Sequence, residues 1–447
     1  MKLFLQHRTQ QNFSALKRCI INVKNFLSTP ESTMNEGEVN KKPKYDGRSK
    51  KRQWQDRRTD KGAGLDPLLQ PKLLRLDQST QIANIDKVKR RKFAILMGYS
   101  GVGYYGMQRN RDTKTIEEDL FKALLDADFI NEECYNQVQN MQFQRAARTD
   151  KGVSAARQVV SLKLKEDFEI SKINERLSDQ IRLFAFKRVT RGFNSKSQCD
   201  ARTYIYVLPT VAFADRDETI TQKEFRISED KLKLINELMQ FYLGTKSFHN
   251  FTTKKKYGDP SAKRFIRTFA CGAPFLKDGV EFCLIKVFGQ SFMMHQIRKM
   301  IGLVLAVVKG MTTQDTLVKA FTSEKVNIPR APGLGLFLDY VHYERYNNRY
   351  GDDGMHEKLT WEEVEKDVQD FKEKQILPTI INTEINEESM VLWMQEKLAL
   401  HSWDETAEKE ESEDEGGGDD DAEEDTGSRK NITEDVEQKR ILQENVI

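Results

Sequence analysis

A single carboxylate in a basic loop is the first candidate for chemistry in this sequence. Asp150 lies in the stretch QRAARTDKGVSA, residues 144–155. Its basic neighbours are Arg145, Arg148, Lys151 and Arg157. A positioned carboxylate can act as a nucleophile or as a base. The alternative is a plain turn, because Asp-Lys-Gly suits a hairpin tip between two alternating stretches. The stretch alone leaves both interpretations open.

A second candidate is the glycine pattern Gly101-Val-Gly103-Tyr-Tyr-Gly106, which matches G-x-G-x-x-G and follows a predicted strand. In dinucleotide-binding proteins this fingerprint opens a helix, so that the phosphates meet the helix N-terminus. Here the residues MQRNRDTK separate the last glycine from the next predicted helix. The next strand also has no clear terminal acid to bind a ribose. The context therefore disfavours a dinucleotide-dependent oxidoreductase, which remains the alternative from a different class of enzyme.

Cysteine and histidine do not form a recognisable metal or redox motif. The 5 cysteines are scattered without a C-x-x-C pair, and the 6 histidines are scattered too. This distribution favours neither a zinc site nor a disulfide framework. The longest apolar stretch, IGLVLAVV at 301–308, is too short to cross a bilayer. We therefore expect a soluble intracellular protein that needs no metal and does not span a membrane.

The two ends of the 447-residue chain carry opposite charge, which the formal net charge of +3 conceals. Residues 1–92 contain 22 Lys/Arg against 9 Asp/Glu, whereas residues 404–425 contain 14 acidic residues and one lysine. Both ends are candidate interaction segments. For the acidic tail, solvated disorder that keeps the protein soluble is the preferred interpretation.

The N-terminal arm contains two possible targeting signals. Residues 1–30 hold Lys and Arg but no acidic residue, and their apolar residues recur at roughly helical spacing. That profile is typical of a mitochondrial transit peptide, and the alternative is a disordered basic arm. The run KKPKYDGRSKKRQWQDRR at 41–58 suits nuclear import or RNA contact. Together the signals predict a mitochondrial and a nuclear form, with Met34 as one alternative start.

The elements that must position Asp150 begin near residue 92. Period-2 and apolar patterns predict strands over 92–99, on both sides of Asp150, and over 201–213, 280–289 and 335–344. Helical periodicity predicts helices over 114–129, 229–244, 291–310 and 312–321, and 173–190 looks like a helix running into a strand. The absence of steady βαβ alternation favours an α+β fold with mainly antiparallel sheets flanked by helices.

Composition and pattern divide the chain into five predicted parts. Residues 1–91 form a basic, mostly disordered arm, and residues 404–447 form an acidic disordered tail. Between them we predict an N-terminal catalytic lobe at 92–210, a C-terminal catalytic lobe at 211–350 and a helical extension at 351–403.

Three stretches, in this order and spacing, resemble the TruA-type pseudouridine synthases. They are GYSGVGYYGMQRN at 98–110, RAARTDKGVSA at 145–155 and QSFMMHQIRKMIG at 290–302, and the resemblance covers about residues 92–345. GFNSKSQCDARTYIY and APGLGLFL are closer to the eukaryotic branch of that family. The resemblance implies two α+β lobes whose sheets meet and leave a basic cleft for RNA. It also implies conversion of uridine to pseudouridine in tRNA, notably in the anticodon stem region, with other RNAs such as mRNA as a wider expectation.

By this resemblance Asp150 is the catalytic aspartate. Arg148 matches the family arginine that would fill the vacated stack or hold a flanking phosphate, and Tyr204 matches the tyrosine expected to stack on the target base. Arg298 matches the arginine that pairs with the carboxylate, although binding of phosphate from its helix is an alternative. Lys151 and Arg109 are further candidate RNA contacts.

The isomerisation breaks the N1–C1′ bond, turns the uracil and rejoins it through C5, so the resemblance implies no cofactor. It leaves open whether Asp150 attacks C1′, attacks C6 or removes a sugar proton. His295 is interpreted as structural, and residues 104–110 as a support for the Asp150 loop. Bacterial relatives form dimers, and we expect the 351–403 extension to cover that surface and leave a monomer. A catalytically inactive RNA chaperone would share the basic surface without needing Asp150.

Overall fold

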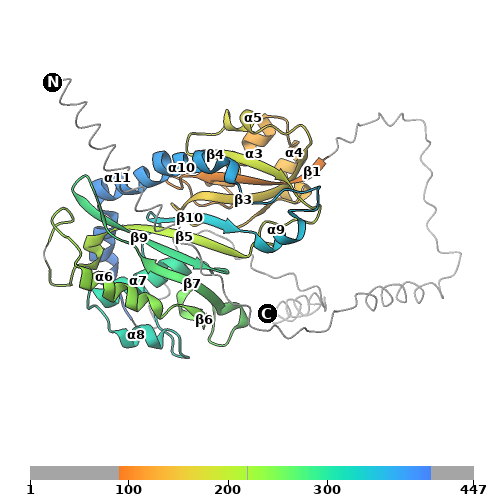
Figure 1. Cartoon of the computed structure of the whole chain (residues 1–447). Helices are drawn as coiled ribbons and strands as arrows, with labels where there is room; N and C mark the ends of the chain where they lie inside the picture. Colours follow the sequence, from red (N-terminus) through yellow and green to blue (C-terminus); the bar gives the residue numbers. More distant parts are fainter. Residues whose placement is uncertain (1–89, 219, 404–447) are drawn as a thin grey trace, which may run out of the picture.

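The computed structural model describes residues 90–218 and 220–403, and its centre is one ten-stranded sheet (Figure 1). Eight strands follow the order β4-β1-β3-β10-β5-β9-β7-β6, while β2 pairs with β3 and β8 with β9. The strands are β1 (Arg90–Tyr99), β2 (Gln144–Arg145), β3 (Ser154–Lys165), β4 (Ile181–Arg188), β5 (Ala201–Pro209), β6 (Gly244–Ser247), β7 (Lys263–Cys271), β8 (Phe275–Lys277), β9 (Val280–Gly289) and β10 (Leu336–His342). The predicted arm at 1–91 and the acidic tail lie almost wholly outside the described residues.

Short and medium helices flank this sheet. They are α3 (Ile116–Asp126), α4 (Glu132–Asn136), α5 (Ile170–Asn174), α6 (Glu229–Gln240), α7 (Gln296–Val308), α8 (Gln314–Lys319), α9 (Glu344–Tyr350), α10 (Glu365–Phe371), α11 (Leu377–Glu387) and α12 (Ser389–Trp393). The mixed α+β class with a mainly antiparallel sheet is thus confirmed, whereas the two lobes and the basic cleft stay predictions. No helix of the described ranges is long and apolar enough to cross a membrane.

Strand β10 connects the early strands to the later ones. It runs parallel to the start of β3, with Phe337 opposite Ser154, and antiparallel to β5, with Leu338 opposite Tyr204. Sequence periodicity cannot reveal this arrangement, because it does not specify which strands pair. Because β10 lies between β3 and β5, the loop that precedes β3 lies next to β5 and next to the segment that precedes β10.

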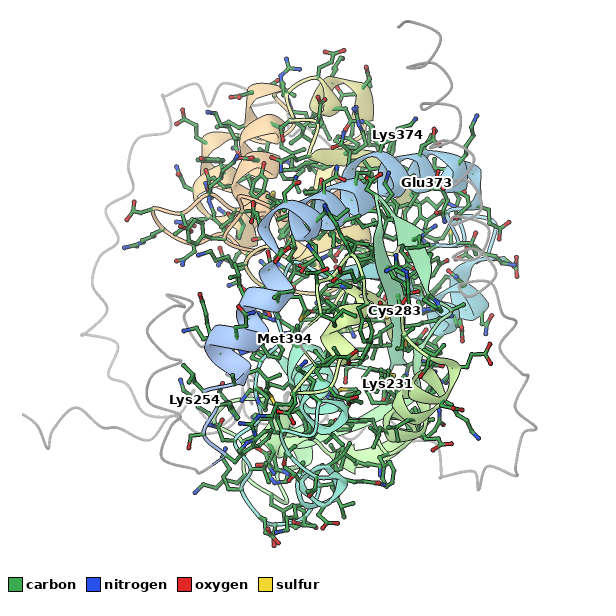
Figure 2. All side chains as sticks on the ribbon, turned by 90° about the vertical axis from the view of Figure 1, so that its left-hand side faces the viewer. Lys231, Lys254, Cys283, Glu373, Lys374 and Met394 are labelled. Carbon is green, nitrogen blue, oxygen red and sulfur yellow. The ribbon has the colours of Figure 1, made fainter. Side chains whose placement is uncertain are left out.

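The helices after residue 360 pack on the sheet, α10 on β3 and α11 on β5. Figures 1 and 2 show α10 and α11 lying across the strands. Lys372, between these two helices, donates to Asp339 Oδ1 of β10 at 2.7 Å, and both side chains are buried. Arg157 of β3 donates to the Asp339 carbonyl at 3.1 Å and to Glu365 of α10 at 2.7 Å. Removing one partner of a buried ion pair such as Lys372–Asp339 typically costs about 3–5 kcal/mol. The Lys372–Asp339 pair therefore ties the extension to the sheet.

Candidate active site

Asp150 lies in the loop of residues 146–153, which joins β2 to β3. Gln144 pairs with Ser161, so the connection is a wide loop that folds back on β3. A local turn is present within it, because the Val153 amide donates to the Asp150 carbonyl at 3.1 Å and Gly152 has a φ of 77°. The Asp150 side chain is 23% exposed. The predicted turn chemistry is therefore real, and the carboxylate is still accessible.

Side chains from β3 and β5 hold the loop on the N-terminal side of Asp150. The Gln158 amide donates to the Ala147 carbonyl at 2.7 Å and accepts from the Ala147 amide at 3.2 Å. Arg202 donates to the Ala146 carbonyl through Nη2 at 2.6 Å and through Nε at 3.1 Å. A simple surface hairpin would not need this support, since its backbone groups can bond to water.

The residue next to Asp150 is held from β1. The Tyr99 and Thr149 hydroxyl groups are hydrogen-bonded at 2.9 Å. Burial raises the pKa of Tyr99 to about 12, although its hydrogen bonds to Thr149 and Gln158 oppose the shift. Tyr99 therefore stays a neutral hydroxyl at physiological pH.

The glycines of the G-x-G-x-x-G match support the same loop. A Cβ on Gly106, which has a φ of 95°, would lie 2.7 Å from the Thr149 carbonyl oxygen, and one on Gly101 would lie 2.4 Å from the Val153 oxygen. The Met107 amide donates to the Thr149 carbonyl at 3.1 Å. Helix α3 does not begin until Ile116. Gly101 and Gly106 thus permit close approach of two backbone segments, and the glycine pattern does not open a helix for a dinucleotide.

Arg298 reaches Asp150 from the first turn of α7, across 148 residues of sequence. Arg298 Nη1 lies 3.4 Å from Asp150 Oδ2, and its Nε donates to the Ala331 carbonyl at 2.8 Å. The Arg298 side chain is 12% exposed. A Cβ on Gly333 would lie 3.6 Å from Arg298 Cζ and 3.0 Å from the Lys151 carbonyl oxygen. The backbone at Gly333 therefore packs both against Arg298 and against the residue that follows Asp150. The ion pair fixes the orientation of the carboxylate.

His295 and Arg330 lie on the far side of the Asp150 carboxylate from its own loop. His295 Nε2 lies 3.8 Å from Asp150 Oδ2, and Arg330 Nη1 lies 3.1 Å from the same ring nitrogen. His295 has a φ of 60° and directly precedes α7. Asp150 is therefore the acidic member of a cluster whose other members, within the described residues, are basic.

Tyr204 of β5 is close to the site, but its ring is covered. The residue is 6% exposed, and its ring meets that of Phe292 edge-on at 5.3 Å. Burial raises the pKa of Tyr204, and the nearby charge of Asp150 adds to the shift. Tyr206, two residues on, is fully buried and donates to the Pro332 carbonyl at 2.8 Å. Tyr206 is thus a core residue, whereas the stacking role of Tyr204 stays a prediction.

The remaining candidate RNA contacts differ in their surroundings. Arg148 and Lys151 are exposed on either side of Asp150, and the Lys151 ammonium lies 4.5 Å from the centroid of the exposed Tyr105 ring. Arg109 instead donates to Glu118 at 3.0 Å and lies over the Tyr135 ring at 4.2 Å. These contacts give Arg109 a structural role between α3 and α4, and contact of any of the three with RNA stays a prediction.

Two of the basic neighbours of Asp150 in sequence point elsewhere. Arg145 pairs with Glu117 of α3, whose pKa is raised by burial in spite of that pairing. Arg157 binds Asp339 and Glu365, as described above. Arg145 of β2 is paired with Val160 of β3, three positions from Arg157, so the two arginines lie on opposite faces of the sheet.

Sequence reasoning did not assign roles to Gln158, Arg202 or Arg330. Gln158 offered a signal, because it is a polar residue next to the apolar pair Val159-Val160 and is fully buried within the mostly buried strand β3. A buried polar side chain requires a partner, so its position alone indicates a specific contact. For Arg202 and Arg330 the contacts depend on the tertiary fold.

Comparisons with known proteins identify the family to which the chain belongs. Residues 238–344 match a family model described as tRNA pseudouridine synthase. Pseudouridylate synthase 1 homolog of Mus musculus is 51% identical over 326 residues, which cover 72% of this chain and 77% of the relative. The Homo sapiens homolog is 52% identical over 318 residues, covering 70% and 74%. tRNA pseudouridine synthase 1 of Saccharomyces cerevisiae is 31% identical over 390 residues, covering 69% and 70%. This extent of identity over most of both chains shows that the protein belongs to the TruA-type family of tRNA pseudouridine synthases, which are isomerases.

Proposed function

We propose that Asp150 is the catalytic aspartate of this tRNA pseudouridine synthase. The observation that carries the proposal is the pairing of a partly exposed Asp150 with Arg298 at 3.4 Å, in a loop held by three strands. A residue with only a turn function needs neither the ion pair nor the fixed backbone. Preorganised charge is a common means of lowering an activation barrier in a protein site.

One carboxylate is sufficient for the proposed reaction. The N1–C1′ bond of uridine breaks, the uracil turns within the site, and a C5–C1′ bond forms. C5 gives up its proton and N1, which has lost its bond to C1′, gains one, so the product is an isomer of the substrate. Hydrolytic glycosidases need a second carboxylate because water is the incoming group. Here the leaving uracil is itself the incoming group, and no electrons are gained or lost. The proposed reaction therefore uses no cofactor.

The exposed cations around Asp150 suit a uridine that leaves its RNA stack. Extruding a nucleotide costs a few kcal/mol, which contacts with the flanking nucleotides can offset. Arg148 and Lys151 lie on the loop beside Asp150 and would contact the flanking phosphates or occupy the vacated stack. Tyr204 would stack on the target base after Phe292 moves off its ring.

The proposed substrates are uridines of the anticodon stem region of tRNA, together with selected uridines in other RNAs such as mRNA. We propose a monomer, since the 351–403 extension occupies sheet surface through the buried Lys372–Asp339 contact. The targeting patterns in the N-terminal arm support mitochondrial and nuclear forms.

The direct test is incubation of the purified protein with unmodified tRNA and mapping of pseudouridine at single-nucleotide resolution. New pseudouridine in the anticodon stem region, formed without added metal or nucleotide, is the expected result. Binding of tRNA without any pseudouridine would favour the RNA chaperone. Modification confined to another arm of the tRNA would contradict the proposed target region.

A further inference from the structure

A loop with three consecutive lysines lies outside the Asp150 loop of residues 146–153. We call residues 252–258, TTKKKYG, the lysine loop. Lys254 and Lys256 are exposed, and Tyr257 at its tip is 55% exposed. Lys255 Nζ lies 3.6 Å from Asp259 Oδ2, which offsets part of the positive charge. The loop still carries a net positive charge.

The lysine loop is connected to the active site through Asn250. The Asn250 amide donates to the Glu324 carbonyl at 2.9 Å and accepts from the Val326 amide at 3.2 Å. Four residues after Val326, Arg330 contacts His295 beside Asp150. Four residues of extended chain span at most about 14 Å. The lysine loop therefore lies beside one end of residues 326–330, at Val326. At the other end of that segment, Arg330 reaches the Asp150 site.

The described C-terminus meets the same segment. The Asn327 side-chain amide donates to the Ser402 carbonyl at 2.8 Å, and His401 Nε2 lies 3.1 Å from the Asn327 carbonyl oxygen. Figure 2 shows Lys254 and Met394, which precedes these residues, on the same side of that view. The described chain thus ends, at Trp403, next to residues that contact Asn327, which lies in the segment between Val326 and Arg330.

The residues that follow have the complementary charge. Residues 404–425 contain 14 Asp/Glu and a single lysine. Their composition alone does not identify a partner, but the described chain ends beside Asn327, close in sequence to Val326 and Arg330. Unlike charges attract strongly within the Debye length, which is about 10 Å at 0.1 M salt. A segment of 22 residues can extend to about 75 Å, so it can reach every cation of this surface.

We propose that residues 404–425 bind the lysine loop and Arg330 and compete there with the phosphates of RNA. The competition for the catalytic surface rests on the proposed site at Asp150. The same cations attract an acidic peptide and a phosphate backbone, and both interactions weaken as salt rises. Attachment to the same chain raises the effective concentration of the acidic segment to the millimolar range. An RNA that makes many contacts displaces the segment, whereas a weakly bound RNA does not.

Four full-length proteins test this proposal in a double-mutant cycle. The first is the unaltered chain, and the second has every Asp and Glu of 404–425 replaced by Asn or Gln. The third carries Lys254→Asn, Lys255→Gln and Lys256→Gln, where Asn suits the φ of 59° at position 254. The fourth combines both changes. A control set replaces Lys172, Lys233 and Lys374 by Gln, since these lysines are exposed and Figure 2 places Lys374 far from Lys254.

The dissociation constant for unmodified tRNA is measured at 50 mM and 300 mM KCl. Neutralising the tail should tighten binding about three- to tenfold at 50 mM KCl and have little effect at 300 mM. In the lysine-loop background the gain should fall below about twofold, whereas it should persist in the control background.

Equal affinity of the unaltered and tail-neutralised proteins would overturn the proposal. An undiminished gain in the lysine-loop background would also overturn it and would indicate that the tail acts elsewhere, for instance on the basic arm. The readout is affinity alone, so an error in the assignment of Asp150 would show separately, in pseudouridine formation.

Discussion

Replacing Arg298 separates its two possible roles, orientation of Asp150 and binding of RNA phosphate. Arg298→Met keeps the length and apolar stem of the side chain but removes the charge. In the structure Nη1 lies 3.4 Å from Asp150 Oδ2, and Nε is bonded to the Ala331 carbonyl. Hydrogen bonds to charged groups contribute about 1.5–3 kcal/mol. Since about 1.4 kcal/mol corresponds to a factor of ten, we expect the single-turnover rate to fall about 10- to 150-fold.

Arg298→Lys is the matched control, because it keeps the positive charge but lacks an Nε that can bind Ala331. We expect its rate to lie between those of Arg298→Met and the unaltered enzyme. The assay is single-turnover pseudouridine formation on saturating enzyme, with tRNA affinity measured in parallel over a range of salt concentrations. Orientation of Asp150 predicts a loss in rate with nearly unchanged affinity.

The opposite outcome would refute this reasoning. If Arg298 bound phosphate, Arg298→Met would weaken tRNA binding on all sequences and reduce the salt dependence by about one counterion. A rate at saturation equal to that of the unaltered enzyme, combined with such a change in binding, would show that Arg298 does not act through Asp150.

Three further predictions concern other parts of the chain. Tyr204→Phe should keep most activity, whereas Tyr204→Ala should lose about 5- to 150-fold, since stacking on a base contributes about 1–3 kcal/mol. Equal losses in single-turnover assays would contradict a stacking role. Burial raises the pKa of Glu384 to about 7, so the folded protein keeps a proton that the unfolded chain loses, and stability should fall as pH rises from 4.5 to 7. Glu384→Gln should then stabilise the protein by about 1–3 kcal/mol at pH 8 and by less at pH 5, as measured by urea unfolding, and an equal gain at both pH values would argue against a buried neutral acid. A reporter fused to residues 1–40 should enter mitochondria, and a reporter that stays in the cytosol would exclude the transit peptide.

Local patterns predicted much of the framework. β1 and β9 occupy the stretches where apolar periodicity placed strands, and α3 begins at Ile116 after Thr115, whose side chain caps it. Helix α7 begins at Gln296 and not at residue 291, because His295 adopts a left-handed conformation that ends the preceding segment. Such a conformation depends on tertiary contacts, and helical periodicity does not reveal it.

The chemistry of the site was predicted less completely from local pattern. The Asp150 stretch showed a turn, which is present, but the turn interpretation does not account for Gln158 and Arg202, which hold the loop. The proximity of Arg298 to Asp150 came from resemblance, because no local rule joins residues 148 positions apart. The parallel pairing of β10 with β3 creates that proximity, and sequence periodicity does not specify strand partners.

The most direct test of the account is the activity of Asp150→Asn on unmodified tRNA. Asn keeps the size and turn propensity of the residue and removes the charge, and Asp128→Asn is a matched control on an exposed loop. We expect Asp150→Asn to form no detectable pseudouridine while tRNA binding persists, because binding depends on many contacts between phosphates and cations. Asp128→Asn should be fully active. An Asp150→Asn enzyme with the activity of the unaltered protein would contradict the proposed mechanism and leave Asp150 as a turn residue.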